Sequence, residues 1–550
     1  MKKILVPAIA LALPAAMLAQ SAVDAYNLTQ TELRGTARFL GMGGAFTALG
    51  GDLSAVGQNP AALGVYRSSE IGATLDINFR NYESTNGTEK QTKAFCNNFG
   101  YVGVVRLDGA LRTFAWGASY NRKASFNRIT NGYNPTLDTS LSNYIASYTT
   151  ANGVYYKDMD FGDNYNPYFD PAPTTGLYND WLSILAYSSY MINPINTQGD
   201  SYAGLYQQGT QGDAYYQAHE RGYIDEYNFS FGGNVSDVVS WGVNIGITDL
   251  SYDRSVVYDE SLGNAYIATQ PNENDPDYVR MGTGNAGFDL YNGQSISGTG
   301  WNFNVGLIFK PINELRLGLS VKTPTWWRLQ HSVYTDVNYS YTDPNAPETK
   351  TNPLKGTEYT GDENNPGDAY DSRLTSPWHI NIGIAAVLGG QAIISADYER
   401  IAYPDMKIKH QAGYYGNDFV EATAFNQDIK DYFQAANALR LGVEYRVTPQ
   451  FSLRAGYAWQ SSAVKSEAAD GDLPIYTTGC DPSYTFNKTV NQFSVGLGYR
   501  YQQWYIDAAY VYRKRDGEYH AFTNFDGYTA PTGHINDSNS SLVLSTGFKF

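Results

Sequence analysis

Arginine side chains recur on the polar face of the strands that we expect in the C-terminal part of the chain. Arg440, Arg454 and Arg500 all alternate with apolar neighbours. A guanidinium group can grip a carboxylate through two parallel hydrogen bonds, so these residues could clamp an acidic substrate. They could instead pair with nearby acids such as Glu444 and Asp507 and hold another segment in place. We favour this second role, because isolated charges in an interior are unfavourable.

The chain shows no motif that indicates catalysis. It has neither the Gly-x-Ser-x-Gly elbow of hydrolases nor the His-Glu-x-x-His pattern of zinc proteases. Two cysteines, Cys96 and Cys480, are too few for a common zinc site, and whether they are bonded stays open. The six histidines fall mostly in segments expected to be loops: His219, His331, His379, His410, His520 and His534. We therefore predict no enzyme activity, no catalytic residue, no metal site and no cofactor.

Period-two alternation is the strongest structural signal along the chain. Phe493, Val495 and Leu497, for example, alternate with Ser494 and Gly496, so one face of the segment is apolar and the other is small or polar. The same pattern predicts fourteen strands, at 70–81, 94–106, 112–124, 223–235, 240–254, 297–310, 315–330, 376–388, 391–405, 436–447, 450–462, 489–501, 503–515 and 539–550.

The connections between these strands are alternately short and long. Turns such as 107–111, 389–390 and 502–503 are brief, whereas connections such as 125–222 and 255–296 are long. Short turns at one end and long loops at the other are typical of an antiparallel transmembrane β-barrel. A soluble β-sandwich also has alternating strands, but loops of such length are uncommon in a compact sandwich. We therefore predict an all-β fold, with a barrel and its long extracellular loops over 70–550.

The N-terminal residues and the overall composition fit an exported barrel. Residues 1–19 combine two lysines, an apolar run and small residues, which predicts a signal peptide cleaved after Ala19 or after Ser21. The formal net charge of -16 argues against a nucleic-acid partner, which needs a positive surface. The chain contains 47 Tyr, 24 Phe and 9 Trp, and aromatic girdles at both membrane interfaces are a feature of such barrels.

A short helix is expected within the first long loop, over 176–192. Its apolar residues recur at helical spacing, which predicts an amphipathic face. This face could pack inside the loop, or it could form an exposed surface where an apolar ligand first leaves water. For the second role the candidate docking residues are Trp181, Leu182 and Leu185.

Residues 20–69 precede the first strand and show no extended alternation. A barrel of about fourteen strands is too wide to be filled by its own side chains, so this segment is expected to plug it. Its many glycines permit close approach to the wall, and Pro60 restricts the chain before it enters the first strand. The residues expected to form this hatch are Phe39, Met42, Phe46, Asn59, Pro60 and Ala61.

The stretch GTARFLGMGGAFTALGGDLSAVGQNPAALG, residues 35–64, resembles the N-terminal hatch of the FadL/TodX family. The fourteen strands and the terminal Phe550 fit that family too. The resemblance implies a channel in the outer membrane of a Gram-negative bacterium, for passive uptake of long-chain fatty acids or other hydrophobic compounds. It also implies contacts with outer-membrane lipid and with the barrel-assembly machinery, which would recognise Phe550.

Family members bind their ligand between long extracellular loops, and several release it through a lateral gap beside a kinked strand. In this chain 112–124 alternates smoothly, so no kink is visible there. Some FadL-like barrels serve instead as partners in protein secretion or surface attachment, and that alternative stays open. The two functions differ in the interior, because a transporter needs a continuous apolar pocket between its loops and its hatch.

Overall fold

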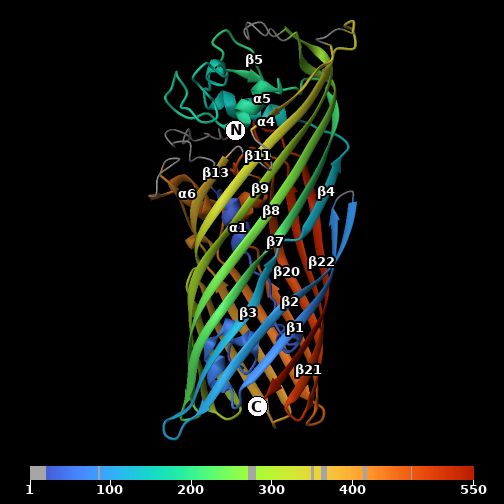
Figure 1. The fold of residues 1–550 in the computed structure, drawn as a ribbon. Helices are drawn as coiled ribbons and strands as arrows, with labels where there is room; N and C mark the ends of the chain where they lie inside the picture. Colours follow the sequence, from blue (N-terminus) through green and yellow to red (C-terminus); the bar gives the residue numbers. More distant parts are fainter. Residues whose placement is uncertain are drawn as a thin grey trace.

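The computed structural model describes residues 20–84, 87–270, 280–348, 352–360, 368–412, 418–471 and 473–550. The expected signal peptide, 1–19, lies outside the described residues. Antiparallel strands form a closed barrel, because β1 (Glu70–Ser84) pairs with β22 (Thr532–Lys549) from Glu70 to Ser84 (Figure 1). The predicted transmembrane β-barrel of fourteen strands is confirmed.

Fourteen crossings make the wall, and three of them are interrupted and carry two labels each. In chain order they are β1, β2 (Gly87–Arg106), β3 (Leu111–Ser125), β7 (Gln211–Val235), β8 (Val239–Gln270), β9 (Arg280–Ile312), β10 (Leu315–Lys322) with β11 (Trp326–Thr342), β13 (Asp368–Thr375) with β14 (His379–Leu388), β15 (Ala392–Ile401) with β16 (Lys407–Gln411), β18 (Ala436–Arg446), β19 (Phe451–Gln460), β20 (Tyr484–Tyr501), β21 (Trp504–His520) and β22.

The remaining elements belong to the N-terminal segment, defined here as residues 20–69, or to the long-loop end. The segment contains α1 (Ala22–Thr29), α2 (Ala37–Gly41), α3 (Leu53–Gln58) and the 3-10 helix η2 (Pro60–Val65). The long-loop end carries β4 (Arg128–Asn134), α4 (Leu141–Ala151), η3 (Tyr156–Asp158), α5 (Trp181–Ser188), β5 (Asn193–Pro194), β6 (Tyr202–Ala203), β12 (Leu354–Tyr359), η5 (Tyr403–Asp405), β17 (Phe419–Glu421), α6 (Thr423–Tyr432) and α7 (Ser466–Ala469). No helix among the described residues is long and apolar enough to cross a membrane.

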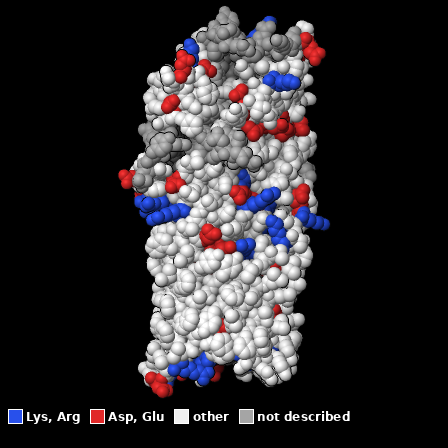
Figure 2. All heavy atoms as spheres, viewed as in Figure 1, with Lys and Arg blue, Asp and Glu red and all other residues white. Residues whose placement is uncertain are grey.

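Apolar side chains cover the outside of the barrel over the half nearest the short turns. On β9 the outward residues Trp301, Phe303 and Val305 are exposed, while Asn302 and Asn304 between them are buried. Figure 2 shows this half almost free of charged groups except at its lower end. This apolar belt is the surface that faces lipid.

Above the belt the polarity of each strand inverts. On β8, Val243, Ile245 and Ile247 face outward, whereas Leu250 and Tyr252 point inward and are buried. Water replaces lipid outside the wall at this height, so the apolar side chains turn to the interior. β8 and β9, with 32 and 33 residues, extend far beyond the 9–11 or so that a membrane crossing needs. Much of the predicted loop 255–296 is therefore strand.

Three neighbouring crossings break at a proline. Pro324 separates β10 from β11, Pro377 separates β13 from β14, and Pro404 lies in η5 between β15 and β16. Proline lacks the N–H that a ladder position requires, which accounts for the interruptions. The predictions of continuous strands over 315–330 and 391–405 were wrong at these points.

The histidines and cysteines also differ from expectation. All six histidines lie in strands rather than in loops, because the strands run past the belt: His219 in β7, His331 in β11, His379 in β14, His410 in β16, His520 in β21 and His534 in β22. Cys96 is exposed on β2, and Cys480 is buried at the long-loop end. The two thiols are free, and burial raises the pKa of the Cys480 thiol.

Candidate functional site

The N-terminal segment lies inside the barrel, at the height of the belt (Figure 1). Its backbone and side chains bond to strands on several sides of the wall. Ala37 N donates to Ser545 Oγ of β22 at 2.7 Å, and Thr47 N donates to Asp397 Oδ2 of β15 at 2.8 Å. Phe39, Met42 and Phe46, the apolar hatch residues expected from sequence, are all buried among these contacts. The segment thus fills the lower half of the interior.

Asn59 ties the end of α3 to the wall and starts η2. Its Nδ2 donates to Thr47 O at 2.6 Å and to Leu307 O at 3.3 Å, and its Oδ1 accepts from Ala61 N at 3.0 Å. Pro60 follows as the first residue of η2, where its missing N–H has no cost. A Cβ on Gly306 of β9 would lie 1.8 Å from Asn59 Oδ1, so only glycine admits this contact.

Ion pairs fix the segment to the side of the barrel near β18. Arg38 Nε lies 2.9 Å from Glu444 Oε2, and Arg454 bridges Glu444 and Asp507 at 2.6 Å each. Arg454 therefore belongs to a network that holds the segment. Of the other two predicted interior arginines, Arg440 pairs with Glu399. Arg500, in contrast, is exposed at the short-turn end of β20, because the row of buried inward residues ends at Gly498.

Helix α1 lies higher, where the wall has turned its apolar side inward. The Tyr26 ring stacks on Phe433 with centroids 4.7 Å apart and meets Tyr403 edge-on at 5.5 Å. Ser21 and Asp24 form a capping box at the start of the helix. An apolar cluster therefore surrounds α1 in the upper interior.

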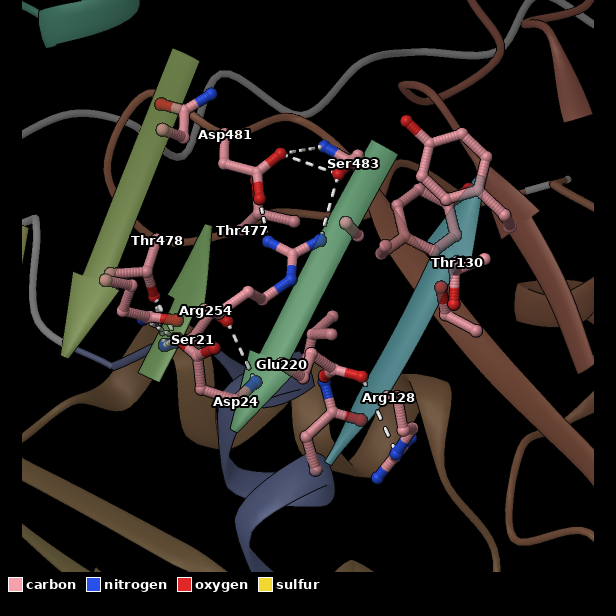
Figure 3. A pocket seen from close by; sticks show the side chains of 18 of the residues that line it. Ser21, Asp24, Arg128, Thr130, Glu220, Arg254, Thr477, Thr478, Asp481 and Ser483 are labelled. Atoms are coloured by element: carbon pink, nitrogen blue, oxygen red, sulfur yellow. Dashed lines mark hydrogen bonds and ion pairs between the residues drawn. The ribbon is translucent and has the colours of Figure 1, made fainter. Parts of the chain in front are cut away.

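Above α1 lies a small polar pocket with about 60 Å³ of free space (Figure 3). Arg254 of β8 reaches Asp481 and donates to Ser483 Oγ at 3.1 Å. The N–H of Ser21 donates to Thr478 Oγ1 at 2.8 Å, so the start of α1 is joined to the loop at 477–483. With its charges paired, this pocket connects α1 to the long-loop end.

Below α1 lies a larger cavity of about 200 Å³ between the N-terminal segment and the wall. Tyr26, Leu28, Phe126 and Trp327 give it apolar surfaces, and charged side chains line the rest. Most of its charged side chains are paired across short distances: Lys322 with Glu226, Arg440 with Glu399, Arg513 with Glu32, Arg128 with Glu220 and Arg515 with Asp537. The cavity is therefore amphipathic.

Lys123 is the cation of this cavity that lacks such a pair. Among the described residues none forms a hydrogen bond or an ion pair with its Nζ. Lys123 is the extra residue of a β-bulge, since Arg122 pairs with Asp225 and Ala124 with Ile224. Its carbonyl accepts a 2.8 Å hydrogen bond from Glu32 N of the N-terminal segment. An ammonium group without a direct partner among the described residues therefore faces the amphipathic cavity, and the N-terminal segment holds the backbone of its residue.

The wall has a seam directly above this bulge. β3 ends at Ser125, and β4 pairs with β7 but not with β2. Residues 88–97 of β2 consequently pair only with β1 among the described strands. Side chains cross the gap instead, as where Asn131 Nδ2 donates to Glu89 Oε1 at 3.2 Å. The smooth alternation over 112–124 concealed this interruption, because the bulge and the break are backbone features.

The helix expected within 176–192 is present as α5, but its apolar face is not free. Trp181 and Leu185 are 5% and 1% exposed, and Leu182 packs against the same cluster. Trp181 Nε1 also donates to Tyr168 O at 2.8 Å. Of the two alternatives, packing inside the loop agrees with this burial and an exposed docking surface does not, because α4 and the strand extensions cover these residues. Their role is packing.

A scan against protein families matches residues 234–524 to the family described as outer membrane protein transport protein (OMPP1/FadL/TodX). The chain belongs to this family, which places it in the outer membrane of a Gram-negative bacterium. No curated protein sequence matches it.

Among solved structures, the CymD monoaromatic hydrocarbon channel is similar at 12% identity and a TM-score of 0.47, covering 94% of this chain and 98% of the other. A Pseudomonas aeruginosa FadL homologue is similar at 14% identity and a TM-score of 0.49, covering 94% and 99%. The Pseudomonas putida toluene transporter TodX is similar at 13% identity and a TM-score of 0.44, covering 94% and 99%.

The bonds of Asn59 make a direct prediction. Asn59→Ala leaves the buried carbonyl of Thr47 and the partly buried carbonyl of Leu307 without this donor, and should destabilise the lower end of the segment by about 1–3 kcal/mol. Hydrogen exchange of peptides covering 47–66 should then accelerate about tenfold or more. Thr31→Ala, at an exposed position of the same segment, is the matched control and should leave exchange unchanged. Equal exchange in both variants would show that Asn59 does not anchor the segment.

Proposed function

We propose that this protein is a passive channel for hydrophobic molecules, with long-chain fatty acids as the class that fits best. Membership in an outer-membrane transport family gives the general activity, and the interior supports the finer assignment. The observation that carries it is the amphipathic cavity below α1, where apolar side chains and paired charges share the lining with the ammonium group of Lys123, which has no direct partner among the described residues. This is the shape of site that an apolar chain with an acidic end would occupy.

The N-terminal segment acts as the hatch in this proposal, with residues 20–69 as the plug and 70–550 as the barrel. Several kinds of contact hold it: buried apolar side chains, the Asn59 bonds and the ion pairs of Arg38 and Glu32. Polar interior residues such as Asn302 and Asn304 would otherwise line an aqueous channel, since a barrel of this width cannot fill itself.

Removing the hatch should open the channel to water. Deletion of 22–57, with the rest of the chain retained, should give an inserted barrel that conducts small ions in planar bilayers and takes up less hydrophobic substrate. Heat-dependent migration on gels checks that the barrel has folded. A folded deletion variant with conductance as low as the parent would refute the plug.

Lys123 distinguishes a fatty acid from a neutral hydrocarbon. Lys123→Met keeps the length of the side chain and removes its charge, so it should lower uptake of a long-chain fatty acid about tenfold or more, the worth of one charged hydrogen bond. Uptake of an alkane of equal chain length should not change. Lys123→Arg is the matched control and should retain most fatty-acid uptake.

Equal loss for both solutes in Lys123→Met would indicate a damaged channel rather than a lost carboxylate contact. Unchanged uptake of both would remove the fatty-acid assignment and leave a channel for neutral hydrophobic compounds.

The exit route that the geometry supports is sideways, through the seam between β2 and β4. The cavity is lined by Arg122, Ser125 and Phe126 at the base of this seam, whereas the hatch closes the way toward the short turns. Among the described residues, every hydrogen bond across the seam involves a side chain and no ladder joins β2 to β4, so the seam can open without breaking a β-ladder.

Closing the seam with a disulfide tests this route. A Cβ on Gly87 would lie 3.2 Å from Asn131 Cγ, so Gly87→Cys with Asn131→Cys, in a Cys96→Ser background, brings two thiols together. Oxidation should reduce hydrophobic uptake several-fold, and a reductant should restore it. Each single cysteine variant serves as the control. Full uptake by the fully oxidised protein would show that solute leaves by another path.

Two further partners belong to this proposal. Outer-membrane lipids surround the belt, and the barrel-assembly machinery would insert the fourteen strands. No nucleic-acid partner and no cofactor are part of the mechanism.

A further inference from the structure

The outer wall carries a basic groove at the upper edge of the belt, on the side of α6. It holds about 580 Å³ and lies where the ladder between β15 and β18 ends, at the pair Ile401 and Ala436. Above this pair the chain turns away through η5, and Pro404 forms one margin of the groove. The groove is therefore a product of the strand break.

The lower part of the groove is apolar and continuous with the belt. Trp378 and Ile380 line it and are 41% and 40% exposed. Below them Ile382 and Ile384 continue the outward apolar row along β14. Tryptophan at this height is typical of the boundary between hydrocarbon and headgroups.

Basic side chains line the groove beside this apolar part, and Arg400 lies opposite Ile380 in the ladder of β14 and β15. Arg400, Lys430 and Lys465 line it, together with one carboxylate, Asp405. The guanidinium group of Arg400 forms no hydrogen bond or ion pair with any described residue, and Lys465 Nζ donates to the carbonyl of Lys430 at 2.5 Å. Figure 2 shows Lys and Arg gathered at the upper edge of the charge-free half, at the height of α6 in Figure 1.

We propose that this groove binds the phosphate groups of an anionic glycolipid in the outer leaflet of the outer membrane. Three cations against a single carboxylate suit a phosphorylated headgroup, and the apolar margin beside them, continuous with the belt, suits its acyl chains. Because the groove lies at the edge of the belt, the headgroup of one lipid can contact the cations while its acyl chains contact the apolar margin. The site faces away from the cavity and does not depend on the transport proposal.

The floor of the groove connects the lipid to the interior. Phe433 is one of the residues that line the groove, and its ring, which is fully buried, stacks on Tyr26 of α1 with centroids 4.7 Å apart. A lipid in the groove would therefore lie next to the residue whose ring packs on the hatch helix.

Binding of diphosphoryl lipid A to the purified full-length protein in detergent, measured by native mass spectrometry, tests the proposal. The variant Arg400→Gln with Lys430→Gln and Lys465→Gln should bind at least about tenfold more weakly, since each Lys or Arg near an anionic lipid surface strengthens binding and the variant removes three of them. The matched control is Lys90→Gln with Arg221→Gln and Arg328→Gln. It removes three exposed cations elsewhere and should bind like the parent.

Equal binding by the groove variant and the parent would overturn the proposal, as would an equal loss in the control. Competition by millimolar inorganic phosphate would assign the groove to a free anion and would also overturn it. Heat-dependent migration confirms folding of each variant. If the triple variant does not fold, Arg400→Gln alone, at an exposed position, should still weaken binding several-fold, and unchanged binding would refute the site.

Discussion

The structure depends on one constraint: each long strand must be apolar on its outer face within the membrane and apolar on its inner face above it. On β8 the change falls between Ile247, which is exposed, and Leu250, which is buried. The same wall thus has a polar interior in its lower half and an apolar interior in its upper half. Every feature of the site follows from which half it occupies.

Different interactions hold the N-terminal segment in the two halves of the barrel. In the lower half it is held by polar bonds, as at Asn59 and between Arg38 and Glu444, because the wall there offers amides and charges. In the upper half α1 is held by aromatic packing of Tyr26 on Phe433. The amphipathic cavity lies where the polar and the apolar halves of the interior meet. This position explains why it combines apolar walls with charged groups and with Lys123, a cation that pairs with none of the described residues.

The sequence alone predicted the belt strands, the short turns and a buried N-terminal segment, because each is set by local alternation or by turn residues. It missed the strand extensions because the expected pattern assumed lipid outside the whole wall. The breaks were visible in principle, since Pro324, Pro377 and Pro404 cannot continue a central strand. The unpaired Lys123 and the seam could not be predicted, because a β-bulge has no characteristic residue types in this sequence. The burial of Trp181 likewise depends on distant elements that cover α5.

The three proline breaks lie in neighbouring crossings at the level where the polarity inverts. Outside the wall they free the space that becomes the basic groove, and inside it they bring Tyr403 and Phe433 against α1. The opposite side of the barrel is interrupted too, at Phe126 and Asn127 between β3 and β4. Both interruptions contact the N-terminal segment, one through Tyr26 and the other through the bond from Glu32 N to Lys123 O. A shift of α1 would therefore change contacts at both interruptions of the wall at once. The continuous ladders below them, which form the apolar belt, need not move.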